Sequence, residues 1–231
     1  MKILFVGPSL PDARLLVEGQ NIQIAGPAVQ GDVAAAVRRG ATAIGIVDGG
    51  FEYTAPVRHK EILFALSQDV AVYGAASMGA LRAAECKAFG MIGVGRIFHD
   101  YDSGIIVDDA DVALLHAPAE LGYRSLTLAL VNVRATLDGL EQTNRLAHDA
   151  RILIETSANH IFFKDRTWRS VVDNCAAFGS AQKAELVALL RAGAIDQKRV
   201  DALSLIEVLQ AAGGHRPEHE RSWHFNETFQ M

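Results

Sequence analysis

Short apolar runs alternate with helical patterns along the first half of the chain. The runs at residues 2–6, 22–24, 43–47 and 70–73 are typical of buried strands, and the segments at 32–39 and 56–66 have apolar residues at helical spacing. Strands and helices that alternate in this way predict an α/β fold with a mostly parallel sheet and flanking helices, either Rossmann-like or flavodoxin-like.

The pattern changes near residue 117, where helical periodicity takes over and no convincing strand follows. We expect amphipathic helices at 125–137, 144–159, 166–176, 181–191 and 198–212. The expected organisation is an α/β core domain at 1–116, an all-helical C-terminal subdomain at 117–214 and a tail at 215–231. Near the end of the core, residues 96–107 resemble a hairpin that turns at 102–104.

The segment from Val70 to Met91 is the most informative part of the pattern. A short β-branched run, a turn of very small residues and an Ala/Leu-rich helix predict a strand, a sharp turn and a helix. Residues 75–79, Ala-Ala-Ser-Met-Gly, have the shape of the nucleophile elbow G-x-S-x-G with Ala in place of the first Gly. Ser77 would stand at the positive end of that helix, as a nucleophile, an anion-binding residue or a helix cap.

Three polar, glycine-containing loops follow expected strands, at residues 7–11, 48–52 and 74–79. In parallel sheets ligands sit outside the carboxyl ends of the strands, so these loops should face one crevice. The N–H group of Met78 could contribute to an oxyanion hole there, with a second donor from the loop at Gly7.

A serine nucleophile requires a base. His59 is the best-placed histidine because it begins the helix after the 48–52 loop, and Asp48 or Glu52 could orient it. In the alternative interpretation His59 is a polar residue in a first helical turn, and the two carboxylates lie in a solvated loop.

The net charge, the apolar runs and the cysteine positions exclude several classes of protein. A net charge of -5 over 231 residues argues against nucleic-acid binding by phosphate neutralisation. No apolar run is long enough to span a membrane, and residues 1–8 resemble a strand rather than a signal peptide, so we expect a cytoplasmic protein. Cys86 and Cys175 lie far apart on expected helices and are expected to be core residues.

Two further groups could bind a metal ion. Asp108, Asp109 and Asp111 form an acidic cluster, for which a solvated turn or a helix cap is the commoner role. His215, His219 and His224 in the tail fit a metal tract only loosely, and a mobile or partner-binding terminus fits them better. We therefore expect no metal centre.

Several ordered motifs resemble the core of the TfuA-like family. They are Gly7-Pro8-Ser9-Leu10, Gln30-Gly31-Asp32, Asp48-Gly49-Gly50-Phe51-Glu52, residues 57–63 and residues 74–85, continued by residues 89–95 and 108–113. The resemblance covers roughly residues 1–120, and so many motifs in order make chance an unsatisfactory explanation.

The resemblance implies an accessory role beside YcaO-type enzymes, which use ATP to activate a peptide amide for replacement of oxygen by sulfur or for ring formation. TfuA-like proteins are associated with backbone thioamidation of ribosomally made peptides. They are thought to recruit or release sulfide, or to activate the YcaO partner. This chain contains no ATP motif, so we expect no cofactor and a role in supplying sulfur.

Two functions follow from the resemblance together with the site. If sulfur arrives as a thiocarboxylate on a ubiquitin-like carrier protein, a Ser77 nucleophile with His59 as base could release it as hydrosulfide. Alternatively, the chain is a noncatalytic partner whose Ser77 helix terminus binds an anion or a peptide and whose helical half docks on the YcaO enzyme. The expected binding residues are Gly7, Ser9, Lys60, Met78, Gly79 and Arg82.

Overall fold

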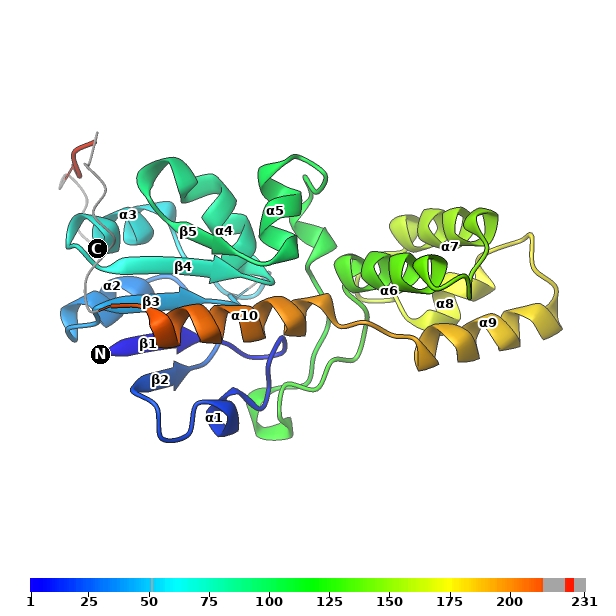
Figure 1. The fold of residues 1–231 in the computed structure, drawn as a ribbon, viewed down its shortest axis with the longest axis horizontal. Helices are drawn as coiled ribbons and strands as arrows, with labels where there is room; N and C mark the ends of the chain where they lie inside the picture. The colour runs from blue at the N-terminus through cyan, green and yellow to red at the C-terminus, as the bar shows by residue number, and fades with distance from the viewer. Residues whose placement is uncertain (51, 214–222, 227–231) are drawn as a thin grey trace. The chain divides into compact units, whose positions relative to one another are not determined.

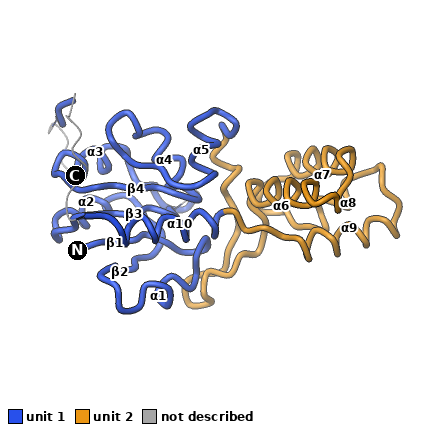
Figure 2. Tube along the Cα trace, viewed as in Figure 1, with its two compact units in different colours: residues 1–107, 198–231 blue, residues 108–197 orange. Residues whose placement is uncertain are grey.

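The structure is a computed structural model that describes residues 1–50, 52–213 and 223–226. It divides into two compact units, residues 1–107 with 198–231 and residues 108–197, which Figure 2 colours separately. No helix among the described residues is both long and apolar enough to cross a membrane.

Five parallel strands form one sheet in unit 1, in the order β2-β1-β3-β4-β5 (Figure 1). Their bounds are β1 Lys2–Phe5, β2 Ile22–Ala25, β3 Ala43–Ile46, β4 Ala71–Ala75 and β5 Ile92–Val94. This order is that of flavodoxin-like proteins, and it confirms the predicted α/β class. Its topological switch point lies between β1 and β3, because the chain moves outward from β1 to β2 and then crosses to the other side.

Helices cover both faces of this sheet. They are α1 Ala13–Leu16, α2 Asp32–Arg38, α3 His59–Ser67, α4 Met78–Cys86 with the 3₁₀ turn η1 Lys87–Phe89, α5 Arg96–Asp102 and α10 Gln197–Ala211. The crossovers through α2, α3 and α4 run in one direction along the sheet and the one through α1 runs in the other, so right-handed connections place α1 on the opposite face. The same face carries α10, which crosses in front of the strands in Figure 1. Leu205 and Leu209 of α10 belong to one hydrophobic core cluster with Leu4 and Tyr73 of the sheet and Ala13 of α1.

Glycines let α4 approach the sheet closely. A Cβ atom at Gly79 would overlap the carbonyl oxygen of Ile46 in β3, and one at Gly74 would overlap the carbonyl oxygen of Gly79. The Gly79 N–H group donates to the Val47 carbonyl, at 3.1 Å. The small residues of the expected strand–turn–helix therefore serve the close packing that the sequence predicts.

The hairpin expected at residues 96–107 is wrong, because residues 96–102 form helix α5. The buried Asp201 carboxylate of α10 accepts hydrogen bonds from the N–H groups of Arg96 (3.1 Å) and Ile97 (2.8 Å). Gly95 adopts a φ of +89°, and a Cβ atom there would overlap the Asp201 carboxylate. The helix start is thus capped by a residue about a hundred positions away, which local sequence does not reveal.

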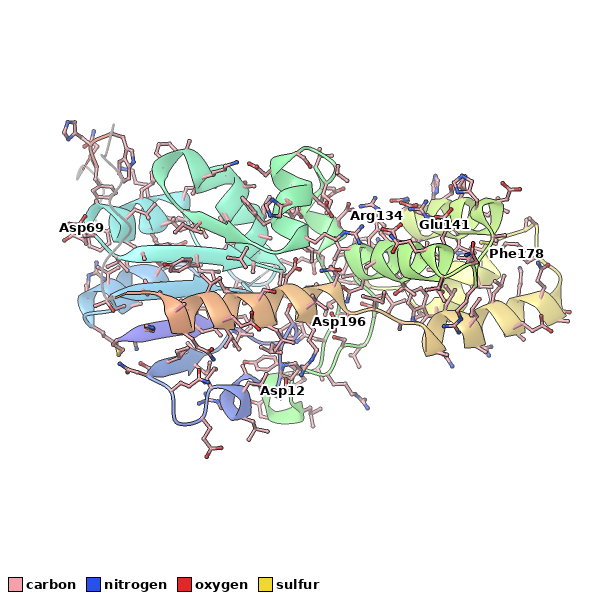
Figure 3. The ribbon with its side chains drawn as sticks, viewed as in Figure 1. Asp12, Asp69, Arg134, Glu141, Phe178 and Asp196 are labelled. Carbon is pink, nitrogen blue, oxygen red and sulfur yellow. The ribbon has the colours of Figure 1, made fainter. Side chains whose placement is uncertain are left out.

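Unit 2 is helical, as expected. It contains η2 Asp109–Asp111, η3 Ala119–Leu121, α6 Leu130–Gln142, α7 His148–His160, α8 Trp168–Asp173 and α9 Ser180–Ala192. Its core includes Leu137, Ile154 and Leu190. Arg134 of α6, labelled in Figure 3, pairs with Asp111 (2.6 Å) and Glu155 (3.1 Å).

Candidate functional site at the carboxyl edge of the sheet

Asp48 joins the loops that follow β1 and β3. Its carboxylate accepts hydrogen bonds from the Gly7 N–H group (2.8 Å), the Ser9 N–H group (3.0 Å) and the Ser9 hydroxyl (2.6 Å). Asp48 and Ser9 are each only 2% exposed. Three predicted site residues therefore come together at the topological switch point, with the carboxylate fully engaged by the neighbouring loop.

In this arrangement Asp48 links the two loops, and its contribution to the free energy of unfolding can be measured. In Asp48→Asn one acceptor oxygen becomes an NH₂ group that faces donors, so we expect the free energy of unfolding to fall by about 2–4 kcal/mol. Asp109→Asn, at an exposed position, should change it by no more than about 0.5 kcal/mol. Urea denaturation followed by circular dichroism measures both changes. Equal unfolding midpoints for the two variants would contradict a stabilising role for Asp48.

Ser77 lies at a sharp turn between β4 and α4. Its N–H group donates to the Ala75 carbonyl (2.8 Å), which closes a three-residue γ-turn. Ala76 at the centre of this turn has a φ of +67°, a strained backbone conformation for a residue with a side chain. The Ser77 side chain is partly exposed and makes no capping hydrogen bond to α4. Ser77 occupies the N-cap position of α4, but its hydroxyl does not supply the capping hydrogen bond that was one of its three possible roles.

Beside Ser77 lies a backbone donor that the described residues leave unbonded. The N–H groups of Gly79 and Ala80 donate to Val47 and Ser77 carbonyls, whereas the Met78 N–H group has no acceptor among the residues that the structure describes. In contrast, the N–H group of Gly7 is held by Asp48. Of the two oxyanion donors suggested by the sequence, only that of Met78 is available in this arrangement.

The 48–52 loop reaches the Ser77 turn through Gly49. A Cβ atom at Gly49 would lie 2.9 Å from the Cγ atom of Met78, so this backbone and the start of α4 are in contact. Glu52, further along the loop, is exposed and has a φ of +59°. Asp48 with its loop partners and the Ser77 turn thus lie next to each other along the carboxyl edge of the sheet.

His59 belongs to a second cluster, on α3 and α4. Its Nε2 atom lies 2.8 Å from the Glu85 carboxylate, and its side chain is 51% exposed. The same carboxylate pairs with Arg82, whose Nε–H group donates to the Val57 carbonyl at 3.0 Å. Glu85 is the site neighbour that the sequence analysis missed, although its spacing of three residues from Arg82 on a helix was a usable signal.

The two clusters are separate in this structure. Glu85 lies seven residues beyond Met78, on the order of 10 Å along the axis of α4. Among the described residues no hydrogen bond joins His59 to Ser77, Asp48 or Glu52. A catalytic role for His59 remains a prediction, and it requires the imidazole to leave Glu85 or to move together with it.

The other candidate groups have structural partners. Asp108 accepts a hydrogen bond from the Ala110 N–H group at 2.8 Å, which is the helix-capping role considered for the acidic cluster. Among the described residues no group of three or more His, Cys, Asp or Glu side chains is arranged to hold a metal ion. His215 and His219 lie outside the described residues.

Both cysteines are buried free thiols. Burial, followed by the Glu85 charge, raises the pKa of the Cys86 thiol to about 11. Cys86 is therefore protonated at neutral pH, and a thiol is a poor nucleophile in that state.

The fold and this edge define a flavodoxin-like α/β protein with a serine at a strand–turn–helix junction. Residues 48–167 match the family described as TfuA-like protein, and they make up just over half of the 231-residue chain. The chain belongs to the TfuA-like family, as its motifs indicated. The matched region includes Asp48, His59 and Ser77 but not Gly7 or Ser9. A comparison with curated proteins finds no match.

Proposed function

We propose that this protein delivers sulfur to a YcaO-type enzyme for backbone thioamidation of a ribosomally made peptide, by hydrolysing a thiocarboxylated ubiquitin-like carrier protein at Ser77. The observation that carries the proposal is that the Ser77 hydroxyl makes no capping hydrogen bond and that the N–H group of the next residue, Met78, has no acceptor among the described residues, in a chain of the TfuA-like family. A nucleophile and a neighbouring oxyanion donor are two of the three groups that acyl transfer by a serine requires, and the third is a base.

The chemistry balances without a cofactor. The Ser77 oxygen attacks the thiocarboxylate carbon while a base takes the serine proton. The C–S bond then breaks, and the base returns that proton to the departing sulfur, which leaves as hydrosulfide. Sulfur leaves readily because thiols are much stronger acids than alcohols. Water then cleaves the serine ester, which returns a carboxylate on the carrier and a free Ser77 hydroxyl.

The burial and raised pKa of both cysteine thiols favour a mechanism of acyl transfer to Ser77 over a persulfide relay. A relay requires a thiolate that is accessible to the sulfur donor, and both thiols of this chain are buried with a raised pKa. In a hydrolytic mechanism the serine accepts the acyl group, so no cysteine takes part.

For the base we retain His59, now with Glu85 in place of Asp48 or Glu52 as the carboxylate that orients the imidazole. This assignment is separable from that of Ser77. If His59 is the base, His59→Ala lowers the rate of sulfide release by about 10²–10⁴-fold, the usual range for general base catalysis.

The second candidate function is a noncatalytic subunit that activates the YcaO enzyme or recruits its substrate. It is favoured by the engagement of His59 and Arg82 with Glu85, and of Gly7 and Ser9 with Asp48, because these pairings leave Ser77 without a base in the present arrangement. Lys60 and Arg82 would then contribute positive charge to a binding surface rather than to catalysis.

Trapping the acyl-enzyme separates the two functions. When the thiocarboxylated carrier is mixed with the protein and quenched in acid, we expect a carrier–chain conjugate whose mass is the sum of both proteins less one H₂S. Hydroxylamine should cleave it, peptide mapping should place it on Ser77, and Ser77→Ala should lack it. Ser103→Ala, at an exposed position, is the matched control. No conjugate and no sulfide, together with YcaO stimulation by Ser77→Ala, would establish the noncatalytic function instead.

A further inference from the structure

A short segment near the C-terminus lies against α3 and η1 of unit 1. The Trp223 Nε1–H group donates to the carbonyl oxygen of Phe89 at 3.2 Å. The two rings meet edge to face, with centroids 5.7 Å apart. One aromatic residue of the segment is therefore fixed by both a ring contact and a hydrogen bond.

The second aromatic residue contacts α3. The ring of Phe225 lies 5.8 Å from that of Phe64, and the Lys60 Nζ atom is 5.9 Å from the centre of the Phe225 ring. Lys60 also donates to the carbonyl oxygen of Asn226, at 3.4 Å. Lys60 and Phe64 are four residues apart and so share one face of α3, which suits them to hold one ring between them.

The segment contacts this face with alternate residues. Trp223 and Phe225 are half-buried, whereas His224 and Asn226 are exposed. A period of two is that of an extended chain, whose successive side chains point to opposite sides. The surface formed by Lys60, Phe64 and Phe89, which we call the aromatic docking surface, thus accepts side chains at positions i and i+2 of an extended peptide.

We propose that the aromatic docking surface is a binding site for an extended segment of a partner protein that carries two aromatic residues at i and i+2, and that residues 223–226 occupy it as an internal competitor. The chemistry of the partner segment is taken from the occupant already seated there. Phe89 remains 37% exposed beneath it, so the contact is a surface contact that another segment of the same kind can replace.

Tethering sets the strength of this competition. A segment on the same chain acts at a high effective concentration, on the order of millimolar for a short linker. An incoming peptide must exceed that concentration or bind more tightly than the tail. Removing the two tail rings should therefore increase the apparent affinity for an added peptide without altering the docking surface itself.

The experiment uses the full chain and a fluorescein-labelled peptide with the sequence of residues 220–228. We expect Trp223→Ala combined with Phe225→Ala to bind this peptide at least about tenfold more tightly than the wild type, by fluorescence anisotropy. Adding Phe64→Ala or Phe89→Ala to that variant should weaken binding at least about tenfold. Phe162→Ala, an exposed phenylalanine in unit 2, should leave the affinity unchanged.

Three results would overturn the proposal. One is equal peptide affinity for the wild type and the variant without tail rings. Another is equal binding of a peptide in which His and Phe are exchanged, since that peptide places the two aromatic residues next to each other. The third is a wild-type dimer in analytical ultracentrifugation that the loss of both tail rings abolishes, because the occupant would then be a second copy of the chain. The proposal goes beyond the sulfur-delivery function and does not depend on Ser77.

Discussion

Replacement of Gly79 by alanine is expected to lower the free energy of unfolding by about 3 kcal/mol or more, although Gly→Ala in an exposed helix stabilises by about 1 kcal/mol. The new methyl group would overlap the Ile46 carbonyl oxygen, which belongs to a central strand and cannot rotate away. Either α4 moves off the sheet and the Gly79 to Val47 hydrogen bond is lost, or β3 is displaced. The steric cost exceeds the gain in helix propensity.

Gly139→Ala is the matched control for Gly79→Ala, because Gly139 also lies inside a helix, α6. A Cβ atom there would be 2.6 Å from the terminal methyl group of Ile195, which can rotate away. We expect its unfolding midpoint to stay close to that of the wild type. If both variants unfold at the wild-type urea concentration, the close packing of α4 on β3 does not limit stability.

Asp201→Ala is expected to destabilise unit 1 by about 3–6 kcal/mol, because two hydrogen bonds to a charged group, worth about 1.5–3 kcal/mol each, are lost. The carboxylate is 1% exposed and accepts from the first N–H groups of α5. Without it these amides lose their charged acceptor, and α5 loses two hydrogen bonds that connect its first turn to α10.

Urea denaturation of Asp201→Ala and Asp173→Ala measures this contribution. Asp173 is exposed, so its replacement should change the free energy of unfolding by no more than about 0.5 kcal/mol. An Asp201→Ala variant as stable as Asp173→Ala would show that the α5 cap contributes nothing to the fold.

Most of the sheet could be predicted because its strands are continuous apolar runs. Four strands match the predicted runs within a few residues, since a parallel sheet buries both faces of each strand. β5 was missed because it is three residues long and contains Gly93. The position of α10 on the sheet could not be predicted from the local sequence pattern either. Its apolar spacing predicts a helix, but no local pattern indicates that it returns to the sheet.

The candidate site was predictable as far as backbone geometry decides it. Small residues and a following helix located the Ser77 turn, and the expectation of parallel strands placed the Asp48 and Gly7 loops at the same edge. Side-chain pairing was not predictable, because Asp48 bonds to Ser9 and His59 to Glu85, contacts between residues 39 and 26 positions apart. Such pairs depend on how helices and loops meet, which periodicity does not encode.

The central claim is that Ser77 releases sulfide from a carrier thiocarboxylate, and the rate of sulfide release by the purified protein tests it most directly. The account predicts measurable release by the wild type and a loss of at least about 10³-fold in Ser77→Ala. The same variant should unfold within about 0.5 kcal/mol of the wild type, because the Ser77 hydroxyl makes no capping bond. Sulfide release by a folded Ser77→Ala variant at the wild-type rate would contradict the account.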